Sequence, residues 1–244
     1  MCRMSAMEAV LLKIARKDLE ASRILFREKL YSQAVFFLQQ SVEKAAKAMG
    51  LREGLVSKKQ LKQKIGHKAW TVFIEYYNIA LKIQKQLECV REEEHVSETL
   101  LYLNMITHGL KPLFEYKKEE TPGKTDEIID DTINHLYTVL KRGEFLKILD
   151  EDTEAILHKP LGLSKITLKE LMTRWKEIGG GGRLVLFVFS YLLERHATWS
   201  RYPDERFNPL EYYSERTPLI KRFNEIANMI DGALKEIEQL YGIS

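Results

Sequence analysis

Apolar residues recur at helical spacing over the first fifty residues of the chain. In two runs, from about Ser5 to Arg27 and from about Ser32 to Leu51, they fall three or four positions apart and so share one helix face. Because only Glu28–Leu30 joins the runs, the pattern predicts two antiparallel helices packed side by side. The small and apolar positions are Leu12, Ala15, Leu19, Ser22 and Phe26 in the first run and Val35, Leu38, Val42, Ala45 and Met49 in the second.

The same spacing continues along the rest of the chain. A third helix is predicted after Gly66-His67, and two further helical patterns lie in the acidic middle. The nearly continuous apolar stretch Leu184–Trp199 predicts a helix buried on most sides, and Thr217-Pro218 suits the start of a last helix. No run of alternating β-branched residues appears, so the predicted fold is all-α: an antiparallel up-down bundle of four to five core helices with an inserted helical segment.

Four glycines, Gly179–Gly182, precede the predicted helix at Leu184. Such a run is also found in loops that cradle phosphates, but those loops follow a strand and end in Lys-Ser or Lys-Thr. Neither feature is present here. The glycines therefore predict a flexible return from the middle of the chain to the bundle.

The second predicted helix carries a polar face. Gln40, Lys44 and Lys47 lie four and three positions apart, so they share one side of the helix. An amide and two ammonium groups together suit a phosphate or the edge of a base. The alternative is a solvated flank that the pair Glu43–Lys47 stabilises.

Two further candidates stand far from this helix in the sequence. His67 opens the third predicted helix, where it either faces the same ligand or has a structural role. Arg201 is followed by Tyr202-Pro203, and the proline restricts the backbone beside the guanidinium. The Arg201 side chain is then available either for an anion or for an ion pair with Asp18 or Glu43.

Charge is unevenly distributed over the 244 residues, although the net charge is only +3. Residues 1–66 hold 14 Lys and Arg against 6 Asp and Glu, whereas residues 91–155 hold 8 against 16. An anionic partner would prefer the first of these regions and avoid the second. The alternative is that both are ordinary solvated helix faces.

Several classes of function lack support in the sequence. Cys2 and Cys89 form neither a disulfide framework nor a zinc spacing, and no His-Glu-x-x-His or Gly-x-Ser-x-Gly motif is present. We therefore predict no metal and no cofactor. The longest apolar run, Leu184–Phe189, is far below the roughly 18 residues of a membrane span, and the first residues lack the apolar core of a secretory signal. These patterns predict a cytoplasmic protein that does not enter the membrane.

Taken in order, four motifs resemble those of the HEPN family of helical bundles. They are Ala15, Asp18, Leu19 and Ala21 in the first helix; Tyr31, Ala34, Phe37, Gln40, Glu43, Lys44, Lys47 and Ala48 in the second; Gly66-His67; and Arg201–Asp204. The resemblance covers about 1–88 and 183–241. It implies a bundle built from residues 1–88 and 183–244, with an acidic helical insertion at 89–182.

The resemblance also implies a function. Family members of this Arg-Tyr-Pro-Asp subtype commonly pair as homodimers, often partner a minimal nucleotidyltransferase, and have been proposed to bind nucleotides or RNA. On this basis the expected function is a nucleotide- or RNA-associated binding module. The expected site residues are Gln40, Lys44, Lys47, His67, Arg201 and Tyr202.

Other members of the family are ribonucleases that use an Arg and a His separated by four to six residues. Here Arg91 and His95 have three residues between them, and Arg195 and His196 are adjacent. Neither pair has the required spacing, so no catalytic residue is predicted. A divergent ribonuclease of a toxin–antitoxin pair and a pure protein-interaction module are the two alternatives.

Overall fold

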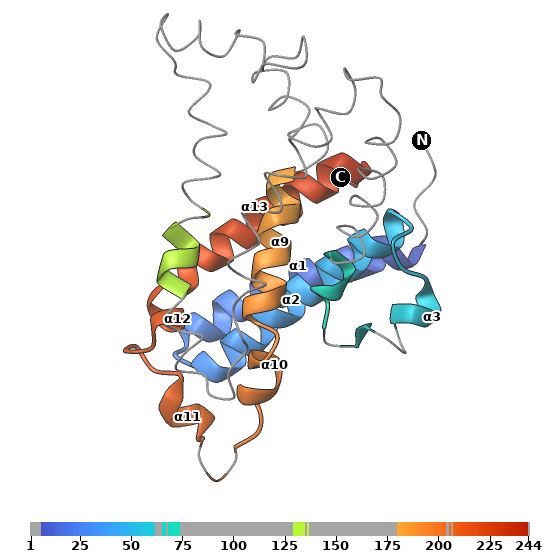
Figure 1. Ribbon diagram of the computed structural model, residues 1–244. Helices are drawn as coiled ribbons and strands as arrows, with labels where there is room; N and C mark the ends of the chain where they lie inside the picture. The colour runs from blue at the N-terminus through green and yellow to red at the C-terminus, as the bar shows by residue number, and fades with distance from the viewer. Residues whose placement is uncertain are drawn as a thin grey trace, which may run out of the picture.

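The computed structural model describes residues 6–61, 65–66, 68–73, 129–134, 136, 180–203, 205 and 207–243. Within these residues every regular element is a helix, as Figure 1 shows. The predicted all-α helical bundle is confirmed. The long helices pack around one apolar core that draws residues from both ends of the chain.

Helices α1 (Ala6–Arg27) and α2 (Tyr31–Arg52) form the predicted antiparallel pair. Their bounds agree with the predicted runs to within one residue. The turn between them is closed by Lys29, which adopts φ of 59°, and by the amide of Leu30, which donates to the carbonyl of Leu25 at 2.9 Å. All five stripe residues of α2 are fully buried, so the sequence pattern located this core face correctly.

Helices α9 (Gly180–Leu192) and α13 (Phe223–Tyr241) complete the bundle, and α9 contacts both α13 and α2. Charged groups join α13 to α1: the guanidinium of Arg16 pairs with the carboxylates of Glu238, at 2.6 Å, and Asp231. Hydrogen bonding to Glu238 raises the pKa of Arg16. The long helices are thus held by apolar packing inside and by ion pairs at the margin.

The labelled short helices of the described residues lie outside this frame. Of these, α10 (His196–Trp199) and α11 (Pro209–Tyr212) follow α9, whereas α3 (Lys58–Gln60) follows α2. Helix α12 (Pro218–Lys221) directly precedes α13. Figure 1 shows α10 and α11 together at the lower end of the bundle.

The prediction of one helix over Leu184–Trp199 was wrong at its C-terminal end. Helix α9 stops at Leu192, and α10 begins only after a turn. Backbone hydrogen bonds three residues apart, from His196 to Leu193 and from Ala197 to Glu194, tighten the chain there. Glu194 also accepts a hydrogen bond from the indole of Trp70 at 2.7 Å. The chain thus leaves α-helical geometry in this turn, although its apolar pattern continues, and Glu194 in the turn forms a tertiary contact.

Helix α9 begins at Gly180, so three of the four glycines are helical. The predicted flexible return is therefore also wrong for Gly180–Gly182. The amide of Gly182 donates to the carboxylate of Glu236 on α13 at 2.8 Å. A Cβ at Gly182 would lie 3.1 Å from the carbonyl oxygen of Ala233. Glycine therefore lets the two helix backbones approach more closely than a Cβ would allow without a shift of its neighbours.

Part of the acidic middle belongs to the same core. Residues 129–134 and 136 are helical, and Ile129, Ile133 and Leu136 are buried, as their spacing predicted. Arg222, which lies between α12 and α13, donates a hydrogen bond from its guanidinium to the side-chain oxygen of Asn134 at 3.0 Å. The other helical patterns predicted in the middle lie outside the described residues.

One carboxylate joins the ends of three helices. Glu53, which follows α2, accepts hydrogen bonds from Arg183 on α9 at 2.5 Å and from the hydroxyl of Tyr241 on α13 at 2.8 Å. Burial raises the pKa of Tyr241, so its hydroxyl stays protonated and remains a donor. This contact closes the bundle at the end opposite α10 and α11.

Candidate functional site

The polar face of α2 is present, but its cations are already paired. The ammonium group of Lys44 lies 2.5 Å from a carboxylate oxygen of Asp18 on α1. It also donates to the side-chain oxygen of Gln40 at 2.9 Å. The neutralising partner is thus the aspartate that shares the α1 motif with Ala15 and Leu19.

Glu43 collects the remaining polar groups of this face. It accepts hydrogen bonds from Lys47 at 2.7 Å, from Gln39 at 3.0 Å and from Gln40 at 3.4 Å. Only 6% of the Glu43 side chain and 17% of the Lys47 side chain are exposed. The predicted Glu43–Lys47 pair therefore exists, but it is packed into the protein rather than lying on a solvated flank.

Arg201 has a different environment. Its guanidinium carbon lies 4.6 Å from the ring centre of Phe36 and 5.0 Å from that of Tyr202. Its Nε donates to the carbonyl of Ala197 at 2.8 Å. The two carboxylates proposed as ion-pair partners, Asp18 and Glu43, bind Lys44 and Lys47 instead. Among the described residues, Arg201 has no ion pair.

The backbone around Arg201 is well defined. The amides of Arg201 and Tyr202 both donate to the carbonyl of Thr198, at 3.0 and 3.1 Å. Pro203 then restricts Tyr202 to an extended conformation and prevents α10 from continuing. The Tyr202 side chain remains 59% exposed as a result.

The structure brings the polar residues of α2 and the Arg201–Tyr202 pair together. Phe36, Gln40, Lys44 and Lys47 follow one another along α2 at spacings of four, four and three residues, which places them on one face. Arg201 packs over Phe36, so it lies at the N-terminal end of this face. We call these four α2 residues the α2 row.

Sequence reasoning missed Phe36, which links the two groups. Its only signal was its position four residues before Gln40. An aromatic residue at helical spacing is usually assigned to the core, and nothing in the local sequence pairs it with a distant arginine. His67 lies outside the described residues, as does Asp204.

Residues 9–95 match the model of the HEPN domain. The chain contains a HEPN domain. The match includes most of α1, all of α2 and the Gly66-His67 motif, and it confirms the resemblance of these three motifs to the family. The Arg201–Asp204 motif lies outside the matched residues. No curated protein and no solved structure matched the chain.

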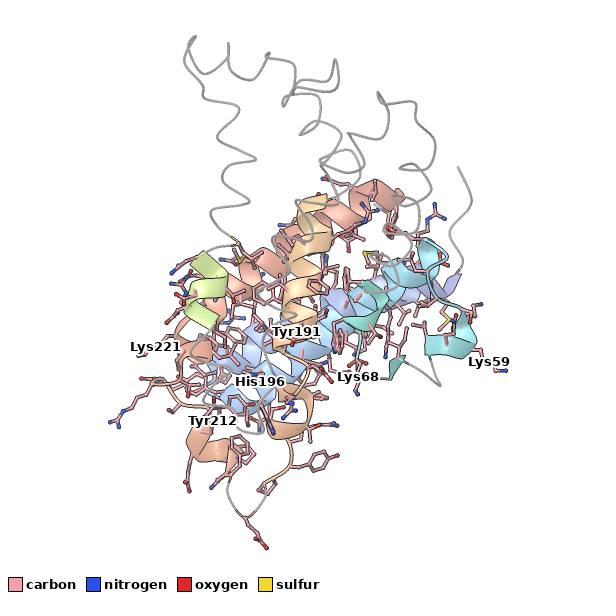
Figure 2. The ribbon with its side chains drawn as sticks, in the orientation of Figure 1. Lys59, Lys68, Tyr191, His196, Tyr212 and Lys221 are labelled. Carbon is pink, nitrogen blue, oxygen red and sulfur yellow. The ribbon has the colours of Figure 1, made fainter. Side chains whose placement is uncertain are left out.

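In this HEPN protein, His196 is fully buried. Its Nδ1 lies 2.7 Å from the hydroxyl oxygen of Tyr213 in a hydrogen bond. Trp199 and Tyr213 lie at its sides, with ring centres 5.4 and 5.8 Å away. Figure 2 shows His196 and Tyr212 in the lower part of the view, where α10 and α11 lie.

Burial lowers the pKa of His196 to about 3, which leaves its imidazole neutral near pH 7. A ribonuclease histidine must contact the RNA backbone to transfer a proton. His196 does not reach solvent in this conformation, so its geometry gives no support to a nuclease centre at Arg195–His196.

The described part of the HEPN protein contains no group of three or more residues placed to bind a metal ion. None of its helices is long and apolar enough to cross a bilayer. The candidate site thus consists of the α2 row together with Arg201 and Tyr202.

Proposed function

We propose that this HEPN protein is a binding module for nucleotides or RNA, with its ligand at the Arg201 end of the α2 row. The observation that carries this proposal is the environment of Arg201. Arg201 is an exposed residue, has no ion pair among the described residues, and holds its guanidinium beside two aromatic rings. A guanidinium in that setting is suited to binding phosphate and to stacking with bases.

Charge distribution supports the same location. Residues 1–66 carry a surplus of Lys and Arg, with 14 against 6 acidic residues, and they include the whole of α1 and α2. The excess of positive charge attracts nucleic acid over several ångströms and raises its local concentration. Arg201 would then supply a directed contact within that field.

A second candidate function is a protein-interaction module that docks a minimal nucleotidyltransferase or a second copy of the chain. Exposed apolar side chains on α1 favour it: Val10 is 51% and Ile24 is 52% exposed. Ile14 lies four positions after Val10 and Ile24 lies fourteen positions after it, so at 3.6 residues per turn all three fall on one side of the helix. Both the homodimer and the nucleotidyltransferase partner remain proposals that rest on family resemblance and on this face.

We also propose that residues 89–182 are an insertion into one HEPN bundle. Support comes from contacts between the flanking parts, of which Glu53–Arg183 is the most direct. Because Ile129 and Ile133 are buried in the common core, the insertion would contribute packing as well as chain length.

The test is a titration of labelled short RNAs and mononucleotides against purified protein, measured by fluorescence anisotropy and by thermal shift. We expect saturable binding by wild type and a loss of at least tenfold in affinity for Arg201→Ala, the cost of a charge-assisted phosphate contact. Lys221→Ala is the matched control, because Lys221 is an exposed cation on α12 away from the α2 row (Figure 2).

Absence of binding to every nucleotide and RNA would contradict the nucleotide proposal and leave protein docking as the better candidate. The salt dependence of binding distinguishes nucleotide binding from protein docking, since phosphate contacts weaken as the salt concentration rises whereas apolar docking does not. Equal losses in Arg201→Ala and Lys221→Ala would show non-specific attraction instead of a site.

A further inference from the structure

The α2 row and the Arg201 turn differ in how much of their charge is already neutralised. Lys44 pairs with Asp18 at 2.5 Å, and Lys47 pairs with Glu43 at 2.7 Å. A phosphate arriving at the row would meet two cations together with two carboxylates. It would have to break an existing ion pair to form a new one, so the row offers little net attraction for a chain of phosphates.

The amide of Gln40 is equally occupied. Its oxygen accepts from Lys44 at 2.9 Å, and its nitrogen donates to Gln39 at 2.8 Å. Reading a base edge with this amide would require the loss of both contacts. The polar members of the row are therefore already occupied by contacts within the protein and do not form a set of free ligand-binding groups.

Arg201 and Tyr202 have the opposite property. Only Nε of Arg201 is bonded, to the carbonyl of Ala197 at 2.8 Å, and its two terminal nitrogens have no partner among the described residues. Tyr202 lies beside that guanidinium with 59% of its surface exposed. The turn thus places an exposed aromatic side chain beside a cation that forms no ion pair with any of the described residues.

We infer that this site binds an unpaired nucleobase together with one adjacent phosphate. The base stacks on Tyr202, and the phosphate accepts hydrogen bonds from the terminal nitrogens of Arg201. This inference rests on the proposed function and specifies its ligand. The same chemistry is available from a single-stranded stretch of RNA and from a free mononucleotide.

A duplex fits this arrangement poorly. Its bases are covered on both faces by their neighbours in the stack, so Tyr202 would have no ring surface to contact. Its phosphates would need several free cations in a row, whereas the described site has one. Discrimination between single and double strands is consequently the clearest property that the geometry predicts.

The first experiment measures the affinity of the full chain for a labelled single-stranded RNA octamer over a series of salt concentrations. We expect log K to fall with log salt at a slope of about 0.7, the value for one phosphate contact with a single strand. An unlabelled duplex of the same sequence and inorganic polyphosphate should compete poorly. A slope of about 2 or more, or equal competition by polyphosphate, would overturn the inference.

The second experiment tests stacking by substitution. Tyr202→Ala should lose about 5- to 150-fold in affinity, the range for removing one base–aromatic stack, whereas Tyr202→Phe should stay within about twofold of wild type. Leu210→Ala is the matched control, because Leu210 is 75% exposed and belongs to the neighbouring α11. Wild-type affinity in a folded Tyr202→Ala variant would overturn the inference.

The two proposals fail in different ways. If no RNA or nucleotide binds the wild type, the proposed function fails and the inference fails with it. If RNA binds but depends steeply on salt and not on Tyr202, only the inference fails. If a mononucleotide binds as tightly as the octamer, the ligand is a free nucleotide. If the mononucleotide binds much more weakly than the octamer, the ligand is single-stranded RNA.

Discussion

His196 begins α10 and Arg201 follows shortly after it, yet their environments are opposite. His196 is completely buried and hydrogen-bonded to Tyr213, whereas Arg201 is exposed beside Phe36 and Tyr202. Both are polar residues of a kind that often serves in active sites. The comparison shows that the role of each follows from its surroundings: His196 belongs to the structure of this end of the bundle, and Arg201 is available for binding.

The difference has a local cause. His196 comes one turn after the apolar helix α9, and it continues into the interior in which Val185–Leu193 are buried. Arg201 comes immediately before Tyr202-Pro203, which directs the chain out of the bundle. Four residues of helix are enough to carry the chain from the interior to the surface.

Substituting each residue with alanine should give the largest contrast in stability. His196→Ala removes a buried ring and its hydrogen bond with Tyr213, so we expect a loss of about 3 kcal/mol in the free energy of unfolding. Arg201→Ala removes an exposed side chain with one hydrogen bond and two cation–π contacts, so it should cost only about 1 kcal/mol. Urea denaturation measures both. Similar losses in the two variants would mean that Arg201 also has a structural role.

The pH dependence of stability should sharpen the same contrast. His196 has a pKa of about 3 in the folded protein, and a histidine in the unfolded chain titrates near 6.5. Between these values only the unfolded chain binds the proton. The contribution of His196 to stability is therefore complete above about pH 6.5 and is lost as pH falls, by roughly 1.4 kcal/mol per unit.

The measurement compares urea unfolding of wild type and His196→Gln from pH 4.5 to 7. Carboxylates titrate in both proteins, so the difference between the two slopes reports His196 alone. Arg201→Ala should retain the slope of wild type. A His196→Gln variant with an unchanged slope would contradict a neutral, buried His196.

The smallest expected effect on stability comes from substitution of Gly182, at the start of the helix α9 that leads to His196. Gly182→Ala would place a Cβ 3.1 Å from the carbonyl of Ala233, so the contact between α9 and α13 must loosen. After the gain in helix propensity is subtracted, we expect a net loss of about 1 kcal/mol. Gly232→Ala, on α13 where an added Cβ would meet no atom within 4 Å, should instead stabilise by roughly 0.5–1 kcal/mol.

Midpoints of urea unfolding distinguish the two glycine variants. Changes of the same sign would show that the close approach of α9 and α13 is not what selects glycine at position 182.

Local periodicity was sufficient to predict the main helices. The bounds of α1 and α2 follow from apolar residues three and four positions apart, and the five stripe residues of α2 are buried as their spacing predicted. Each of these features depends on residues within one or two turns of each other. That is the range over which a single sequence is informative.

Contacts between distant parts of the chain could not be predicted in this way. Nothing near Arg201 indicates that its guanidinium packs on Phe36, and nothing near Lys44 selects Asp18 over other carboxylates. The glycine run before α9 was misinterpreted for the same reason, because its partner Glu236 lies on α13. The candidate residues were identified, but which of their charges remain free depended on the tertiary structure.

The contact between Glu53 and Arg183 has a consequence for synthesis of the protein on the ribosome. The two residues are 130 positions apart in the chain, and α9 and α13 follow only after that interval. At about 5–20 residues per second, the α1–α2 hairpin emerges roughly ten seconds before the helices that cover it. During that time the apolar stripe of α2 depends on α1 alone, or on a chaperone, for protection from aggregation.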